Sequence, residues 1–369
     1  MPLRVLIVPD KFKGSLTAHS AAAAIAAGWR ASRPKDRIEL LPMTDGGDGF
    51  GAVLGELMEA SSERVAAVNA AHRSLSGLWW RSQDGRTAII DSAAIIGLAM
   101  MRRGKFHPFQ LDSFGLGIVM RAAEQGTARG IIGIGGSATN DGGFGMARAL
   151  GWRFFNKARE ELLEWWRLHE LTEVRPPRVS SHWKVTVAVD VANPLLGPNG
   201  CSRIYGPQKG LRPQDFALAE KCLGRLASVM RKQHEIDCAK IPGAGAAGGL
   251  GFGLMVFAGG KIKSGFDVFA DCAGLSKRIA AADLVITGEG RVDRQTYMGK
   301  GVGQVARLCR KARVPCLAIA GEILQPDDAQ RIFARSRALL EIAPLKSAQA
   351  NAARHLQQLA MEMAQEIRQ

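Results

Sequence analysis

DLVITGEGRVDRQTYMGKG, residues 283–301, is the most informative stretch of the chain. It opens on an apolar, β-branched run at residues 284–286, which is typical of a buried strand. We expect that strand to end in a glycine-rich loop whose polar side chains include Glu289, Arg291 and Asp293. Ligands of open α/β sheets bind at the carboxyl ends of strands. The stretch therefore predicts an α/β fold and a loop suited to a phosphorylated, metal-bound ligand, as in an enzyme.

Strand, polar loop and helix alternate at both ends of the chain. Near the N-terminus, the expected elements are strands at 3–8 and 37–41 and helices at 17–29 and 50–59, the first capped by Thr17. After residue 280 the alternation returns, with a helix at about 301–312 and a strand at 315–320. This pattern predicts a parallel sheet with right-handed crossovers.

The middle of the chain is expected to form a second α/β domain, because 369 residues are too many for one ordinary core. Strands are predicted at 88–91, 130–134 and 185–189, each followed by a polar or glycine-rich loop. Residues 152–183 carry four of the tryptophans in a charged stretch. For that segment a helix that buries the tryptophans is favoured, and a dimer contact is the alternative.

Composition restricts the class of partner. The net charge is +15, yet the lysines and arginines are scattered and aromatic residues do not interleave with them, so a nucleic-acid role is disfavoured. A basic, solvated surface that favours anionic small molecules fits better. The six cysteines have no zinc spacing, no run of 18 apolar residues occurs, and the N-terminus resembles a strand instead of a signal peptide. A cytoplasmic protein with reduced thiols is predicted.

Two glycine-rich segments are candidates for nucleotide binding. Residues 243–248 match GxGxxG, but Ile-Pro precedes them in place of a strand, so the dinucleotide motif lacks its context. Residues 133–138 fit the looser GxGxxA form after a predicted strand. Backbone N–H groups there, with the hydroxyls of Ser137 and Thr139, could hold a phosphate. A purely structural turn is the alternative.

Carboxylates and lysines follow other predicted strands. Asp45 and Asp48 flank two glycines, and they could contribute to Mg²⁺ binding or orient a substrate hydroxyl, although one of them could be a helix cap. Asp190 ends a strand as a candidate base, metal ligand or turn former. No Ser-His-Asp or Cys-His set is recognisable, which favours phosphoryl transfer over acyl transfer.

Seven motifs, in order, resemble those of the type I glycerate kinase family. They are PDKFKGSL at 9–16, DGGDG at 45–49, GGSATNDGG at 135–143, DVANPL at 190–195, GPQKG at 206–210, AAGG at 246–249, and GEGRVD at 288–293 with its continuation to Lys300. Asp48 and Asp91 stand where the family frequently has Glu, and residues 152–183 align poorly. No core loop is lost by these departures.

The resemblance implies an ATP- and Mg²⁺-dependent kinase that phosphorylates D-glycerate, with 2-phosphoglycerate as the usual product. It implies a Rossmann-like parallel-sheet domain built from both chain ends, residues 1–80 and 280–369. Residues 81–279 would form an inserted α/β domain, and the active site would lie in the cleft between the two. No nucleic acid or membrane is expected as a partner, and the protein would be a monomer or homodimer.

The resemblance also implies roles for individual residues. The proton acceptor would be Asp293 or Asp190, assisted by Lys13 and Arg291. The nucleotide would be held by Gly135, Gly136, Ser137, Thr139, Asn140, Asp141, Gly288 and Lys300. Glycerate would meet Asp10, Lys11, Ser15, Asp45, Asp48, Gln295 and Thr296, and Mg²⁺ would meet Glu289 and Asp48. Two alternatives stay open: a kinase for another short hydroxy acid, and a non-catalytic nucleotide-binding regulator.

Overall fold

The computed structural model describes residues 1–12, 14–47, 49–102, 104–179, 181–298 and 301–367. The chain forms two compact units: unit 1 is Met1–Asp45 with Phe266–Gln369, and unit 2 is Gly46–Gly265. The boundary predicted at residue 80 falls within two strands, at residues 61–81, that pair with the sheet of unit 2. The boundary predicted at residue 280 falls inside unit 1, whose second part begins at Phe266. The predicted cleft between the domains stays a prediction.

Unit 1 contains one five-stranded sheet in which all paired strands are parallel, in the order β13-β12-β11-β1-β2. The strands are β1 (Arg4–Pro9), β2 (Arg37–Leu40), β11 (Leu284–Val292), β12 (Cys316–Ile323) and β13 (Arg335–Ala338). Counted along the unit, the strand order is 2-1-3-4-5, which places the topological switch point between β1 and β11. Ligands of doubly wound sheets bind outside the carboxyl ends of the strands at such a point.

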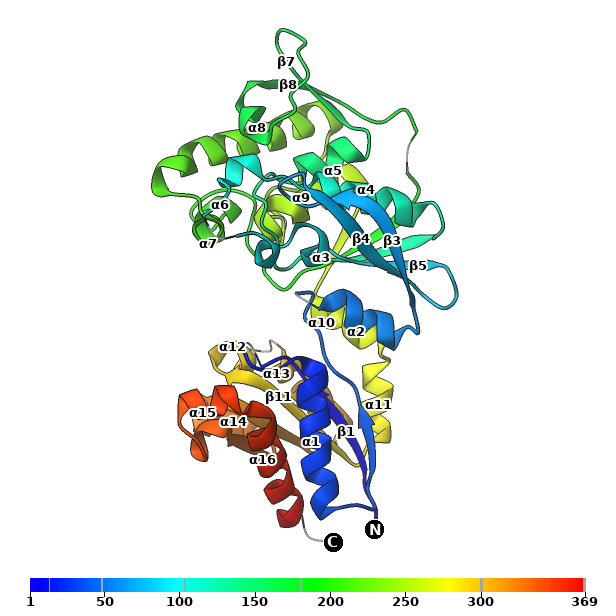
Figure 1. Ribbon diagram of the computed structural model, residues 1–369, viewed down its shortest axis with the longest axis vertical. Helices are drawn as coiled ribbons and strands as arrows, with labels where there is room; N and C mark the ends of the chain where they lie inside the picture. The colour runs from blue at the N-terminus through cyan, green and yellow to red at the C-terminus, as the bar shows by residue number, and fades with distance from the viewer. Residues whose placement is uncertain (13, 48, 103, 180, 299–300, 368–369) are drawn as a thin grey trace. The chain divides into compact units, whose positions relative to one another are not determined.

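Helices cover the sheet of unit 1. They are α1 (Ala18–Ser32), α10 (Gly265–Cys272), α11 (Leu275–Ala281), α12 (Arg294–Tyr297), α13 (Val302–Ala312), α14 (Pro326–Ile332), α15 (Leu345–Ala350) and α16 (Ala352–Glu366). Thr17 caps α1 as predicted, because its side chain accepts the Ser20 N–H at 3.1 Å. The helices α1 and α16 lie side by side (Figure 1), and Trp29 and Leu356 are fully buried in the core that they share with the sheet.

Unit 2 contains a six-stranded mixed sheet in the order β10-β9-β6-β5-β4-β3. The strands are β3 (Ser61–Val68), β4 (Ser74–Arg81), β5 (Thr87–Asp91), β6 (Arg129–Gly133), β9 (Lys184–Ala188) and β10 (Lys261–Lys263). The last four are parallel, so the segments that follow them leave at one edge of the sheet. The strands β3 and β4 form an antiparallel ribbon at the other side.

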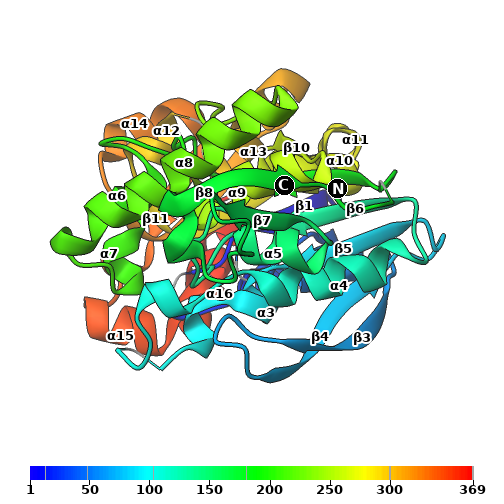
Figure 2. The same ribbon diagram turned by 90° about the horizontal axis from the view of Figure 1, so that it is seen from above.

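The helices of unit 2 are α2 (Phe50–Leu57), α3 (Ala93–Ile96), α4 (Phe114–Glu124), α5 (Phe144–Ala149), α6 (Cys201–Ile204), α7 (Gly206–Lys209), α8 (Phe216–His234) and α9 (Ala246–Ala258). Figure 2 shows α4 running along the β3–β4 ribbon, which it contacts. Both units are α/β, and unit 1 has the parallel sheet built from both chain ends, so the predicted fold class is confirmed. In the described part of the chain, no helix combines the length and the apolar composition needed to cross a membrane.

Residues 152–183 do not form the helix that was favoured. The segment contains a two-stranded antiparallel sheet, β7 (Arg153–Asn156) and β8 (Leu171–Arg175), with a short 3-10 turn at Trp165–Glu170. Trp165 is buried and donates to the Pro108 carbonyl at 3.2 Å, whereas Trp166 is 38% exposed. The prediction was wrong because residues 153–156 and 171–175 pair with each other as antiparallel strands, which leaves only a short 3-10 stretch around Trp165 and Trp166.

The segment 283–301 also differs from its prediction. The expected loop after residue 286 is still strand, and β11 continues to Val292 in parallel pairing with β12. Gly288 permits this continuation, because a Cβ there would lie 2.1 Å from the Ile319 carbonyl oxygen. The polar residues 289 and 291 therefore project from a strand end instead of a free loop.

Candidate active site

In unit 1, carboxylate side chains lie at the switch point between β1 and β11. Asp10 directly follows β1, and its N–H donates to the Gly288 carbonyl on β11 at 2.7 Å. The Asp10 carboxylate accepts the Lys11 N–H at 2.7 Å. Burial, followed by the charge of Asp45, raises the pKa of Asp10 to about 6. The Asp10 carboxyl therefore loses its proton less readily than an exposed aspartate does.

Glu289 is the most strongly perturbed of these groups. Its carboxylate accepts the Thr296 hydroxyl at 2.7 Å. Burial is the main cause that raises its pKa to about 8, and the charges of Asp10, Asp293 and Asp45 add to the shift against the opposing Thr296 hydrogen bond. Glu289 is therefore protonated at neutral pH when no cation is bound.

Asp293 begins the short helix α12. Its carboxylate accepts the Gln295 N–H at 2.8 Å, and its own N–H donates to the Thr296 hydroxyl at 3.3 Å. Thr296 thus connects Asp293 to Glu289, and three of the predicted residues lie in one hydrogen-bonded group. Gln295 contributes only its backbone to these contacts.

The positively charged residues that were predicted for the site do not all lie with its carboxylates. The Lys11 ammonium lies 3.5 Å from the Asp45 carboxylate and so belongs to the cluster. Arg291 instead pairs with Glu322, its Nε 2.8 Å from the Glu322 carboxylate, in an exposed ion pair. Ser15 donates its hydroxyl to the Phe12 carbonyl at 3.1 Å. Lys13, Asp48 and Lys300 lie outside the described residues.

The chemistry of the cluster suits a hard divalent cation, because carboxylate oxygens are its preferred ligands and a cation would relieve the mutual repulsion. Yet among the described residues, no three or more His, Cys, Asp or Glu side chains are grouped so as to hold a metal ion by themselves. Mg²⁺ commonly uses one or two protein carboxylates together with substrate phosphates and water. The residues fit that kind of site, with Glu289 as the candidate ligand.

Unit 2 contains a glycine-rich loop at residues 134–143, which follows β6. Four of its N–H groups bind carbonyls of other segments: Ile134 to Ala188 at 3.4 Å, Gly135 to Gly46 at 3.2 Å, Ala138 to Ile96 at 2.8 Å, and Gly142 to Gly248 at 3.1 Å. These bonds fasten the loop to four separate segments. The main chain of the loop is therefore held in one shape by its surroundings.

The same loop has further backbone N–H groups. Over the described ranges, the backbone N–H groups of Gly136, Ser137, Asn140 and Asp141 meet no protein acceptor. Successive unpaired N–H groups form a concave site for anions. This observation favours the predicted phosphate cradle over a purely structural turn.

The side chains of the loop mostly bind each other or the core. The hydroxyls of Ser137 and Thr139 lie 3.0 Å apart, and both residues are buried. Asn140 donates its side-chain amide to the Ser202 hydroxyl at 2.9 Å, and its buried carbonyl oxygen has no partner within the described residues. The backbone, more than the hydroxyls, is thus available to a ligand.

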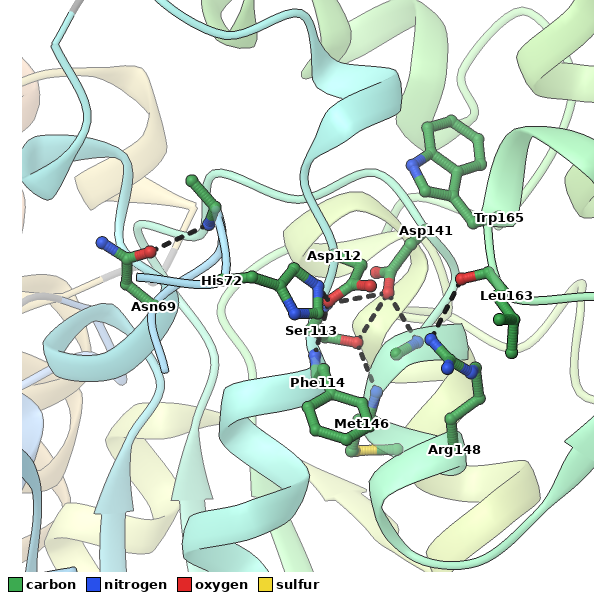
Figure 3. Close-up of polar contacts among 12 residues, drawn as sticks. Asn69, His72, Asp112, Ser113, Phe114, Asp141, Met146, Arg148, Leu163 and Trp165 are labelled. Atoms are coloured by element: carbon green, nitrogen blue, oxygen red, sulfur yellow. Dashed lines mark hydrogen bonds and ion pairs between the residues drawn. The ribbon is translucent and has the colours of Figure 1, made fainter. Parts of the chain in front are cut away.

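Asp141 has a structural role in the described contacts. Figure 3 shows its carboxylate between Ser113 and the start of α5. It accepts the Ser113 N–H at 2.9 Å, the Ser113 hydroxyl at 2.7 Å and the Gly145 N–H at 2.9 Å. Burial, and then the charge of Asp112, raises the pKa of Asp141. A contact of Asp141 with nucleotide stays a prediction.

Asp190 follows β9 at the same sheet edge as the glycine-rich loop. Its carboxylate accepts the Gly265 N–H at 3.2 Å. Asp91, at the end of β5, accepts the N–H groups of Gly49 at 3.1 Å and Ala93 at 3.0 Å. Asp91 therefore fastens the DGGDG segment to the sheet, whereas Asp190 stays a candidate proton acceptor.

Sequence reasoning assigned no role to Lys209. The structure buries this lysine and places its ammonium 2.6 Å from the Thr139 carbonyl oxygen in the glycine-rich loop. Its segment, GPQKG, had been noted as a motif. A lysine flanked by glycines and a proline was the only indication in the sequence. Nothing in the neighbouring residues shows which distant segment such a lysine contacts.

A doubly wound sheet with carboxylates at its switch point, and a second α/β unit with a glycine-rich loop at the edge of its sheet, are the architecture of an α/β enzyme. The particular family follows from comparison with known proteins. The glycerate kinase family model matches residues 5–368, and the chain belongs to that family.

Named relatives agree. "Glycerate 2-kinase" of Escherichia coli K12 is 36% identical over 326 residues, covering 87% of this chain and 86% of that protein. "Glycerate kinase" of Bacillus subtilis 168 is 34% identical over 377 residues, covering 99% and 98%. A crystal structure from Salmonella typhimurium LT2, assigned as a glycerate kinase 2, superposes with a TM-score of 0.85 at 32% identity, covering 99% and 100%.

These matches confirm the predicted family and the prediction of an enzyme of the kinase class. They cover nearly all of the chain, so the regulator alternative loses its support.

Proposed function

We propose that the protein transfers the γ-phosphoryl group of Mg-ATP to D-glycerate and releases 2-phosphoglycerate and ADP. The observation that carries the proposal is the family match over residues 5–368, together with the Escherichia coli relative named glycerate 2-kinase. The free N–H groups of the glycine-rich loop support it, because they suit the phosphates of a nucleotide.

In the proposed reaction, the glycerate hydroxyl oxygen attacks the γ-phosphorus, the bond from phosphorus to the ADP oxygen breaks, and a carboxylate accepts the hydroxyl proton. Phosphoryl transfer depends mainly on positioning and on charge stabilisation. Bound Mg²⁺ would neutralise phosphate charge. Glu289 is the described residue that would hold it, and Lys11 would face an anionic substrate group.

Asp293 and Asp190 are the proposed alternatives for the proton acceptor. Asn replaces either carboxylate with the same shape and can still accept the N–H bonds seen at Gln295 and Gly265. We expect one of Asp293→Asn and Asp190→Asn to lower kcat by about 10²–10⁴-fold, the usual contribution of a general base. Steady-state kinetics of both variants would check this, and near wild-type kcat in both would rule out the assignment.

The direct test is ADP release from Mg-ATP with D-glycerate, set beside L-glycerate and several tetronates, with the product identified by phosphorus NMR. Turnover with D-glycerate and a phosphate on C2 is expected. Turnover with another hydroxy acid alone would keep the kinase and replace the substrate. A C3 phosphate would correct the product, and ATP binding without turnover on any acid would refute the proposal.

We also propose a reducing, cytoplasmic setting. All six cysteines are free thiols, and several are fully buried, such as Cys201 and Cys309. Proteins of oxidising compartments use paired cysteines far more often.

A further inference from the structure

Lys209 is a buried lysine in unit 2 that the proposed reaction does not use. It ends α7, and only 6% of its surface is exposed. Lysine is almost never buried to this degree unless its charge has a partner. No carboxylate forms an ion pair with it within the described residues, so its burial needs another explanation.

The explanation lies in its single contact with the glycine-rich loop. The Lys209 ammonium donates to the Thr139 carbonyl oxygen at 2.6 Å, and across the described residues no other acceptor meets it. Burial lowers the pKa of Lys209 to about 8, while the nearby Cys201 and Asp141 oppose the shift. The lysine is thus mostly charged at neutral pH.

The contact determines the direction of a neighbouring N–H group. A trans peptide unit is planar, so the Thr139 carbonyl and the Asn140 N–H point to opposite sides. Because Lys209 holds the carbonyl on one side, the Asn140 N–H is turned to the other. That N–H is one of the unpaired groups of the proposed phosphate cradle.

The same carbonyl is enclosed from a second direction. A Cβ at Gly248 would lie 2.0 Å from the Thr139 oxygen, so only glycine allows this approach. Gly248 also accepts the Gly142 N–H at 3.1 Å. The segments GPQKG and AAGG, far apart in the chain, therefore meet the same turn of the loop.

We propose that Lys209 is a positioning residue that holds the Thr139 carbonyl and thereby aims the free N–H groups of residues 136–141 at the nucleotide phosphates. The inference rests on the proposed function, since it assumes that this loop receives the nucleotide. It assigns to Lys209 no contact with the substrate.

The test is Lys209→Met, which keeps the length of the side chain and removes its donor and charge. Lys221→Met on α8 is the matched control, because Lys221 is exposed in the same unit. Binding of a non-hydrolysable ATP analogue with Mg²⁺ is measured by calorimetry, together with KM for ATP and for D-glycerate. We expect Lys209→Met to weaken analogue binding about tenfold, as for loss of a hydrogen bond from a charged group, with KM for glycerate unchanged.

A second readout separates positioning from general stability. Hydrogen exchange should rise at the hydrogen-bonded loop amides of Ala138, Thr139 and Gly142 in Lys209→Met, with the rest of unit 2 as protected as in the wild type. Lys209→Gln, which keeps a donor, should lose less affinity than the Met variant.

Three results would overturn the inference: unchanged analogue binding in Lys209→Met, equal loss of affinity for nucleotide and glycerate, or failure of both variants to fold. A wild-type protein that binds no ATP analogue would instead refute the proposed function. The two failures are therefore distinguishable.

Discussion

Single residues in unit 1 show how burial changes the chemistry of a side chain. Glu289 and Asp10 have ordinary carboxylate side chains, yet in the folded protein their pKa values rise to about 8 and about 6. In both, desolvation is the largest cause, and neighbouring carboxylates add to it. The proposed site therefore holds at least one proton at neutral pH that a bound cation would displace.

This protonation predicts a specific pH dependence of stability. The ordinary pKa of Glu289, about 4.5, applies to the unfolded chain, and about 8 applies to the folded protein. Between these values the unfolded state has released a proton that the folded state keeps, so the free energy of unfolding falls as pH rises from 5 to 8. In Glu289→Gln this fall should become smaller, as measured by thermal unfolding in buffers without metal or nucleotide.

Glu322→Gln is the control for this experiment. Glu322 lies on the neighbouring strand β12 and pairs with the exposed Arg291. Exposed ion pairs contribute little to stability, so this variant should keep the wild-type pH dependence. Equal slopes in Glu289→Gln and wild type would show that Glu289 is ionised in the folded protein.

At the scale of elements, the glycine-rich loop depends on segments that are distant in the sequence. It receives hydrogen bonds or close contacts from the DGGDG segment, from α3, from α7 and from the start of α9. Residues 247–249 adopt left-handed backbone angles where α9 begins, which lets the chain pass close to the loop.

Gly248→Ala is predicted to disturb this arrangement. Gly248 has a φ of +74°, and the added Cβ would clash with the Thr139 carbonyl oxygen. We expect the affinity for the ATP analogue to fall about tenfold or more, which is the effect of losing one hydrogen bond to a charged group. The melting temperature should also fall. Calorimetry and thermal unfolding would measure the two effects.

The matched control is Gly224→Ala in α8. A Cβ there meets only Leu196, at 3.6 Å, which is an ordinary contact. Alanine is favoured over glycine in a helix by about 1 kcal/mol, so this variant should be as stable as the wild type or more so. Normal nucleotide binding by Gly248→Ala would show that binding does not depend on the close approach of Gly248 to the Thr139 carbonyl.

For the whole molecule, the two units differ in how the chain builds them. Unit 2 is one continuous segment, whereas unit 1 needs both chain ends because β1 pairs with β11 and β2. Each unit has a hydrophobic core of its own. Continuity and a separate core are the properties of a segment that can fold alone.

A fragment of residues 46–265 is therefore expected to fold cooperatively by itself. Residues 1–45 alone should stay unfolded, because β1 would lack its β11 partner. Urea unfolding followed by circular dichroism would compare the two fragments with the full chain. A broad, non-cooperative transition for residues 46–265 would show that unit 2 depends on unit 1.

Local sequence patterns were sufficient to predict the secondary structure where a strand is an apolar run bounded by polar loops. Alternating apolar runs and polar loops predicted β1, β5, β6 and β9 to within a residue or two, and Thr17 was recognised as the cap of α1. The glycine-rich segments also marked the sheet edges where the proposed ligand sites lie. These features depend on hydrophobic periodicity and backbone conformation, which are properties of neighbouring residues.

Contacts between side chains, in contrast, depend on how distant segments pack together. Arg291 turned to Glu322, Asp141 to Ser113, and Lys209 to Thr139, and none of these pairs is visible in a local pattern. The extension of β11 to Val292 likewise depends on pairing with β12. Burial, pairing register and charge environment arise from segments far apart in the chain, so the protonation of Glu289 and the partner of Lys209 appear only once those segments are packed together.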